Sequence, residues 1–173
     1  MSPRIVHRLI VATATPLALF LVLAARPSVE RVRVGGTFTM TYSQQHPLSV
    51  ADAEGHIVIA NEAKGTNRST GPTPYEDGAD VTIAELADLV QGNGSHQGYV
   101  TKSQNGEVAI DKWSGAVHTV LGPDQKPATT FAGTWTAVKG EEGHGTYKGR
   151  ITGQNSYAVD WQGEVDRTPI ASR

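Results

Sequence analysis

The chain has 173 residues, of which 15 are basic, 17 are acidic and none is cysteine. The formal net charge of −2, without a basic stripe, argues against nucleic acid as a partner. Without disulfides, a domain of this size needs a well-closed hydrophobic core of its own.

The first 25 residues have the order of a secretory signal peptide, in which a positively charged start precedes an apolar run from Leu9 to Ala25. A membrane anchor is the alternative, but the run is short for a bilayer, which needs roughly 20 apolar residues. Pro16 also interrupts it. The sequence therefore predicts cleavage and export, to the periplasm or the medium, with no stable membrane insertion afterwards. Residues 26–173 are expected to form one domain.

Period-two alternation, which is typical of strands, begins at Gly36. The segment Gly36–Tyr42 places Phe38, Met40 and Tyr42 on one face and three threonines on the other. Further strands are expected at 56–60, 129–138 and 145–151. The stretch Asn61–Asp77, rich in Ser, Thr and Pro, is expected to be a mobile crossing loop.

Residues 80–90 are ambiguous, because their apolar positions fit either a three-turn helix or a strand. Ala, Glu and Leu favour a helix by propensity. The hairpins that follow favour a strand, and tertiary context often overrides propensity. We favour the strand, in which Glu85 lies in line with apolar neighbours.

The sequence contains the pattern of one β-hairpin twice, at Gly98–Val117 and at Gly149–Val165. Both copies contain Gly-x-β-Thr, a Gln-Asn turn, an apolar-Asp step and Trp-x-Gly-x-Val. Asp and Trp are two positions apart in the first copy and adjacent in the second, so they cannot keep the same facing relation. The repeat predicts an all-β fold: an antiparallel meander of seven or eight strands that closes into a roughly eight-stranded barrel, with a sandwich as the alternative.

Several glycine–aromatic motifs carry a family resemblance: Gly92–Val100, Trp113-Ser114-Gly115, Gly133-Thr134-Trp135, Gly145–Gly149 and Trp161–Glu164. With these motifs the chain resembles a family of small exported bacterial proteins without an assigned activity. The closing Gly-Thr-Tyr-x-Gly pattern also resembles the allene oxide cyclase and dirigent barrels. That second resemblance implies an eight-stranded barrel with an apolar guest in its lumen. No catalytic residue of the cyclases matches a position in this chain.

Five residues are candidates for a ligand site: Tyr42, Glu85, Asn93, His96 and Tyr99. The last three stand close together at the start of the repeated hairpin, where they could orient the polar end of a guest or serve in proton transfer. The alternative is a tight loop whose side chains bond to their own backbone. The histidines lack metal-ligand spacing, so neither a metal nor a cofactor is expected.

The sequence is compatible with three functions. The first is an exported barrel that binds a small apolar molecule in its lumen. The second is an isomerase or cyclase that acts on such a molecule mainly by confining it. The third is a structural or interaction protein whose barrel is filled by its own side chains. The identity of the ligand and the oligomeric state do not follow from the sequence.

Overall fold

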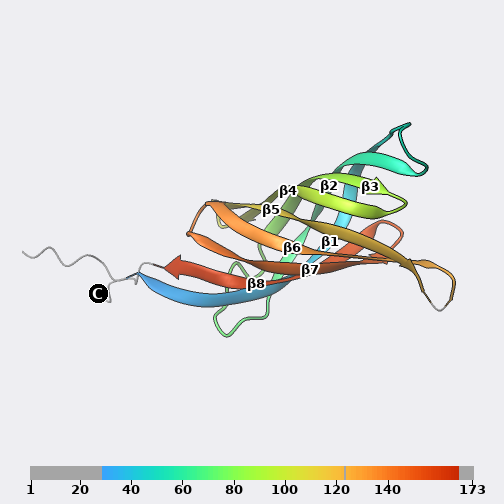
Figure 1. Cartoon of the computed structure of the whole chain (residues 1–173). Coiled ribbons are helices and arrows are strands. Elements are labelled where there is room, and N and C mark those ends of the chain that lie inside the picture. Colours follow the sequence, from blue (N-terminus) through green and yellow to red (C-terminus); the bar gives the residue numbers. More distant parts are fainter. Residues whose placement is uncertain (1–28, 123, 168–173) are drawn as a thin grey trace, which may run out of the picture.

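The computed structural model describes residues 29–122 and 124–167, and within them it shows eight strands and no helix (Figure 1). The strands are β1 (Glu30–Ser49), β2 (His56–Ser69), β3 (Asp80–Val90), β4 (Asn93–Gln104), β5 (Glu107–Leu121), β6 (Pro127–Lys139), β7 (Gly143–Gly153) and β8 (Ser156–Arg167). The expected signal segment lies outside the described residues. In the part of the chain that the structure describes, no helix is long and apolar enough to cross a membrane.

The strands form one closed barrel in which each pairs antiparallel with its neighbours in the chain. The first strand pairs with β2 on one side and with β8 on the other, which closes the sheet. The predicted all-β, eight-stranded meander is therefore confirmed. Residues 80–90 form β3, which is paired along its whole length on both sides, so context overrides the helical propensity of Ala, Glu and Leu.

The repeated hairpin corresponds to β4–β5 and β7–β8, but the two turns differ. In the first copy Asn105 and Gly106 form the turn with φ of 53° and 84°, the left-handed values that a type I′ hairpin requires. In the second copy Gln154 and Asn155 form the turn, and an irregularity between Ile151 and Gly153 adjusts the register. The two copies thus share their strand pattern, but the turn of the second copy begins one residue earlier relative to the shared Gln-Asn pair.

Inward-facing glycines make room in the lumen for aromatic side chains. A Cβ at Gly149 would overlap the ring of Phe131, and a Cβ at Gly115 or Gly133 would overlap the hydroxyl of Tyr147. The Gly-x-aromatic motifs of the sequence are therefore packing units, in which a glycine on one strand lies under a ring from another. This arrangement lets eight strands enclose rings without a wider barrel.

The predicted loop Asn61–Asp77 was too long at its start, because β2 continues to Ser69. The residues after it, 70–79, cross one end of the barrel, the end that also holds both chain termini of the described part (Figure 1). Polar residues in β2 face alternately outward and into the lumen, so the segment carries no apolar stripe that would identify it as a strand.

Candidate functional site

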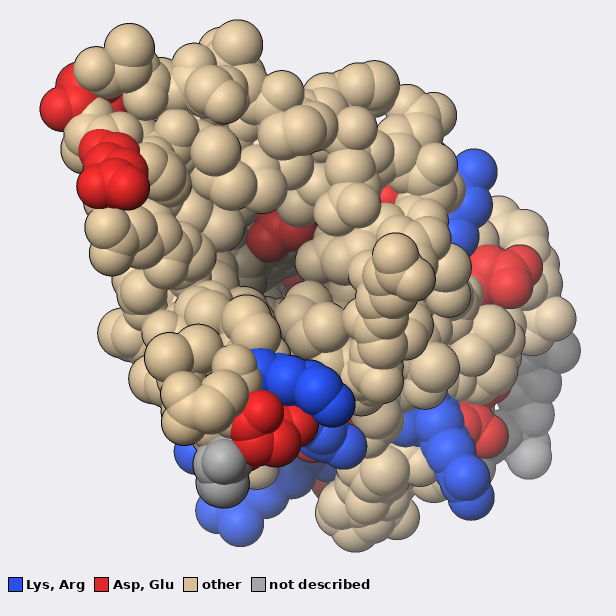
Figure 2. Space-filling view, turned by 90° about the vertical axis from the view of Figure 1, so that its right-hand side faces the viewer, with Lys and Arg blue, Asp and Glu red and all other residues tan. Residues whose placement is uncertain are grey.

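The barrel encloses a cavity of about 340 Å³ that is lined by side chains from all eight strands. Its walls carry eight aromatic side chains: Phe38, Tyr42, Trp113, Phe131, Trp135, Tyr147, Tyr157 and Trp161. The cavity extends to residues near the strand ends opposite loop 70–79, among them Gln45, Leu89 and Gln154. Figure 2 views the barrel from this end and shows a hollow with an acidic side chain inside it.

A chain of hydrogen bonds crosses the cavity wall from Asn61 to Tyr147. The Asn61 amide donates to Glu85 Oε2 at 2.9 Å. His96 Nδ1 lies 2.8 Å from Glu85 Oε1, so this nitrogen carries the proton, because a carboxylate only accepts. His96 Nε2 lies 3.0 Å from the Tyr147 hydroxyl, which donates to it when the ring is neutral. The four side chains therefore form one connected polar group in an otherwise aromatic lumen.

Strand register explains why His96 and Tyr147 meet although 51 residues separate them. His96 pairs with Gly115, Gly115 pairs with Gly133, and Gly133 pairs with Tyr147, so all four share one row across β4, β5, β6 and β7. The two central positions have no side chain. Tyr147 can therefore reach across two strands to the imidazole.

The His96 ring is also held by aromatic contacts. Trp113 and Phe131 meet it edge-on, with ring centroids 4.7 Å and 5.4 Å away. Only 4% of His96 is exposed. Packing from two sides and hydrogen bonds at both nitrogens fix the imidazole in one orientation.

Burial raises the pKa of the Tyr42, Tyr147 and Tyr157 hydroxyls well above the usual value, and the negative charge of Glu85 adds to this in each case. These three phenols therefore keep their protons at neutral pH, and Tyr147 donates its proton to His96. The shared dependence on Glu85 indicates that all three lie within electrostatic reach of its carboxylate.

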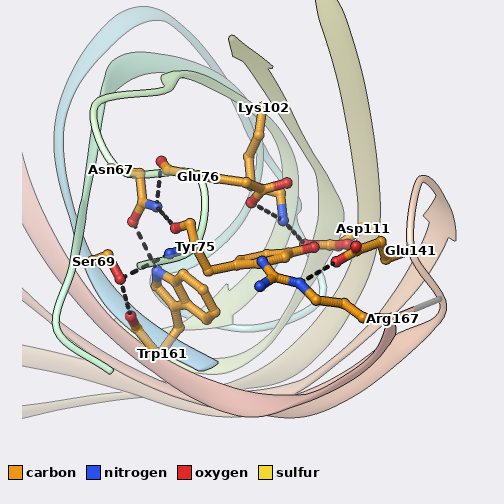
Figure 3. A network of polar contacts seen from close by, with 10 residues as sticks. Asn67, Ser69, Tyr75, Glu76, Lys102, Asp111, Glu141, Trp161 and Arg167 are labelled. Atoms are coloured by element: carbon orange, nitrogen blue, oxygen red, sulfur yellow. Dashed lines mark hydrogen bonds and ion pairs between the residues drawn. The ribbon is translucent and has the colours of Figure 1, made fainter. Parts of the chain in front are cut away.

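A second polar network closes the other end of the lumen (Figure 3). The ammonium of Lys102 lies 2.9 Å from Asp111 Oδ2 and 2.7 Å from Glu76 Oε2, so it forms ion pairs with both carboxylates. The Lys102 ammonium also lies 5.4 Å from the centre of the Tyr75 ring. Burial raises the pKa of Glu76, and the charge of Lys102 opposes this.

Asn67 fixes loop 70–79 at this closed end of the barrel. Its amide donates to the backbone carbonyls of Tyr75 and Glu76, and its Oδ1 accepts a hydrogen bond from the Trp161 indole at 3.1 Å. Tyr75, which is 6% exposed, packs edge-on against Trp161, a residue of the cavity wall. The loop therefore blocks this end of the lumen, and Tyr75 is its residue that packs against the cavity wall.

The structure places the five sequence candidates in two groups. Tyr42, Glu85 and His96 line the cavity. Asn93 and Tyr99 do not: Asn93 bonds to the backbone of Gln91 and Thr119, and Tyr99 is 48% exposed on the outer face. The strict alternation of β4 explains this result, because Asn93 and Tyr99 are both an odd number of positions from His96.

Most residues of the two networks were not singled out from the sequence, among them Asn61, Lys102 and Tyr147. Asn61 was hidden in a segment expected to be a loop. Alternation indicates that Lys102 and Tyr147 face inward, because each lies two positions from a buried residue of its own strand, Val100 and Gly149 respectively. The signal was present for them, but only a barrel with known pairing identifies their partners.

Comparison of the chain with protein-family models, with curated proteins and with solved structures finds no match.

Proposed function

We propose that this protein binds a small, mostly apolar molecule in the lumen of its barrel. The observation that carries the proposal is the cavity of about 340 Å³ with eight aromatic side chains in its wall. Ligand sites are typically concave, mostly apolar and roughly 300–1,000 Å³ in volume, with a few polar groups that orient the guest. An open lumen supports binding over a barrel filled by its own side chains.

The arrangement of the two ends also supports this function. Loop 70–79 closes one end through Tyr75, whereas the cavity reaches side chains at the opposite end, such as Leu89. A guest would therefore enter from the end shown in Figure 2 and stop against the aromatic floor near Trp161. Burial of its apolar surface provides the driving force, at about 25 cal/mol per Å².

Calorimetric titration with the neutral probe 4-phenylbutan-1-ol tests the proposal. We expect saturable binding by the wild type and a loss of about tenfold or more in affinity for Leu89→Trp, which narrows the open end. Leu86→Trp is the matched control, because Leu86 lies on the same strand but faces outward. Absence of binding by the folded wild type, or equal affinity for both variants, would contradict luminal binding.

An isomerase or cyclase acting on such a guest is the second candidate, favoured by the Glu85–His96–Tyr147 chain in the cavity wall. A carboxylate held by two donors can take a proton from the carbon beside a ketone, leaving an enolate, and then return a proton to that carbon. Incubation of 4-phenylbutan-2-one with the protein in D₂O tests this step. Deuterium exchange beside the carbonyl that requires Glu85 supports catalysis, and exchange no faster than in buffer contradicts it.

A further inference from the structure

Negatively charged side chains outnumber positively charged ones in the described lining of the cavity. Two carboxylates line the cavity, Glu85 and Asp111, and among the described residues no Lys or Arg lines it. Asp111 is compensated by Lys102, whose ammonium lies 2.9 Å from Oδ2. Lys102 also pairs with Glu76, so its single positive charge already faces two carboxylates and does not offset the charge of Glu85. Glu85 is thus the luminal carboxylate without a Lys or Arg partner.

The partners of Glu85 are hydrogen-bond donors that are neutral in the simplest protonation scheme. Asn61 donates an amide N–H and His96 donates its Nδ1–H, while the Tyr147 hydroxyl donates to the other imidazole nitrogen. In this scheme each of the three hydrogen bonds has one donor and one acceptor, and the imidazole needs no second proton. The Glu85 side chain is 12% exposed, and because the residue faces inward, that exposed part is directed into the lumen.

A carboxylate in this position costs free energy unless a positive charge reaches it. The surrounding walls suit a cation rather than an anion, because the faces of aromatic rings carry negative potential and attract ammonium groups. Tyr42 and Tyr157, whose ring centroids are 4.8 Å apart, lie within electrostatic reach of Glu85. An anionic guest such as a fatty acid would instead meet an unfavourable charge.

We propose that the guest is a lipophilic amine, bound as its ammonium ion to Glu85 with its apolar body against the aromatic wall. The inference rests on the proposed luminal binding and adds the chemical class of the ligand. Glu85 is then the residue that determines specificity, and His96 and Asn61 position its carboxylate through the hydrogen bonds at Oε1 and Oε2.

Three probes with one apolar body test the charge preference by calorimetric titration at neutral pH: 4-phenylbutylamine, 4-phenylbutan-1-ol and 4-phenylbutanoate. We expect the wild type to bind the amine at least about tenfold more tightly than the alcohol, and the carboxylate most weakly, since hydrogen bonds to charged groups are the stronger ones. In Glu85→Gln the amine should fall to the affinity of the alcohol, and the affinity for the alcohol itself should change little.

Glu62→Gln is the matched control, because it removes the same charge from the exposed outer side of the barrel. The amine preference should survive this change, which separates a contact with Glu85 from a general effect of net charge. If Glu85→Gln fails to fold, the ranking of the three probes in the wild type still decides the matter.

The outcomes separate this inference from the proposed function. Equal affinity for amine and alcohol would overturn the amine assignment and leave luminal binding intact; a charged His96 that already neutralises Glu85 would give this result. Tightest binding of the carboxylate would also overturn it. Failure of the folded protein to bind any of the three probes would overturn the proposed luminal binding as well.

Discussion

Lys102 places an ammonium group inside the barrel, where only 4% of the residue is exposed. Its two carboxylate partners, Glu76 and Asp111, are themselves mostly buried. Removal of one member of a buried ionic group leaves the other buried charges uncompensated. The resulting loss of stability is larger than the net stabilisation that the intact group provides. The free energy of unfolding therefore depends on Lys102 more than on an ordinary surface lysine.

We expect Lys102→Met to lower the free energy of unfolding by roughly 3–5 kcal/mol in urea denaturation. Lys112→Met, on the outer face of β5, is the control and should change it by less than about 0.5 kcal/mol. Adding Glu76→Gln and Asp111→Asn to Lys102→Met should recover part of the loss, because the uncompensated charges are then gone. Equal effects of the two lysine variants would show that the network does not stabilise the fold.

His56, the first residue of β2, forms an ionic group with two carboxylates at the surface of the protein. Its Nδ1 contacts Asp52 and its Nε2 lies 2.7 Å from Asp88, and both carboxylates face water. Hydrogen bonding to Asp52, then to Asp88, raises the pKa of His56, and the same contact lowers the pKa of Asp52. Both shifts favour the charged pair in the folded state.

This pairing predicts a pH-dependent stability. A folded-state pKa above the unfolded value means that the contribution of His56 is fully present below about pH 6.5 and is lost as the pH rises through the raised pKa. The difference in melting temperature between the wild type and His56→Asn should therefore be larger at pH 6 than at pH 9. His118→Asn, at an exposed position of β5, serves as the control. A difference that is constant across this range would contradict the assignment.

Gly149 on β7 illustrates how the strands depend on small inward residues. A methyl group at this position would overlap the Phe131 ring on β6, the residue with which Gly149 is paired. We expect Gly149→Ala to destabilise the protein by about 1–3 kcal/mol in thermal or urea unfolding. Phe131→Leu should reduce that cost in the double variant, and strictly additive losses would argue against a direct clash.

The sequence predicts the strands better than it predicts their contacts. Period-two alternation and turn residues identify the meander, and in-phase alternation along β3 identifies Glu85 as inward-facing. The row from His96 to Tyr147 could not be predicted, because it requires the registers of β4 through β7 together. Residues 61–69 were missed as a strand because polar side chains such as Asn67 face inward, where they bond to a loop and to Trp161.

The closed barrel makes the cavity a property of all eight strands at once. Each strand contributes at least one side chain to the lining, from Phe38 on β1 to Trp161 on β8. The pairing of β1 with β8 completes the wall, so the cavity does not exist until the last strand has docked on the first. A molecule held in this lumen therefore binds the closed fold and has no equivalent site on the unfolded chain.

Binding of a luminal guest should consequently stabilise the entire fold rather than one hairpin. A ligand present at 100 times its dissociation constant adds about 2.7 kcal/mol to the free energy of unfolding when it binds only the folded state. For a domain of this size that corresponds to a rise of roughly 5–11 °C in melting temperature. Thermal unfolding followed by circular dichroism, with 4-phenylbutylamine in increasing concentration, measures the shift. The same titration of Leu89→Trp should give a much smaller rise, and an equal rise in both proteins would place the bound molecule outside the lumen.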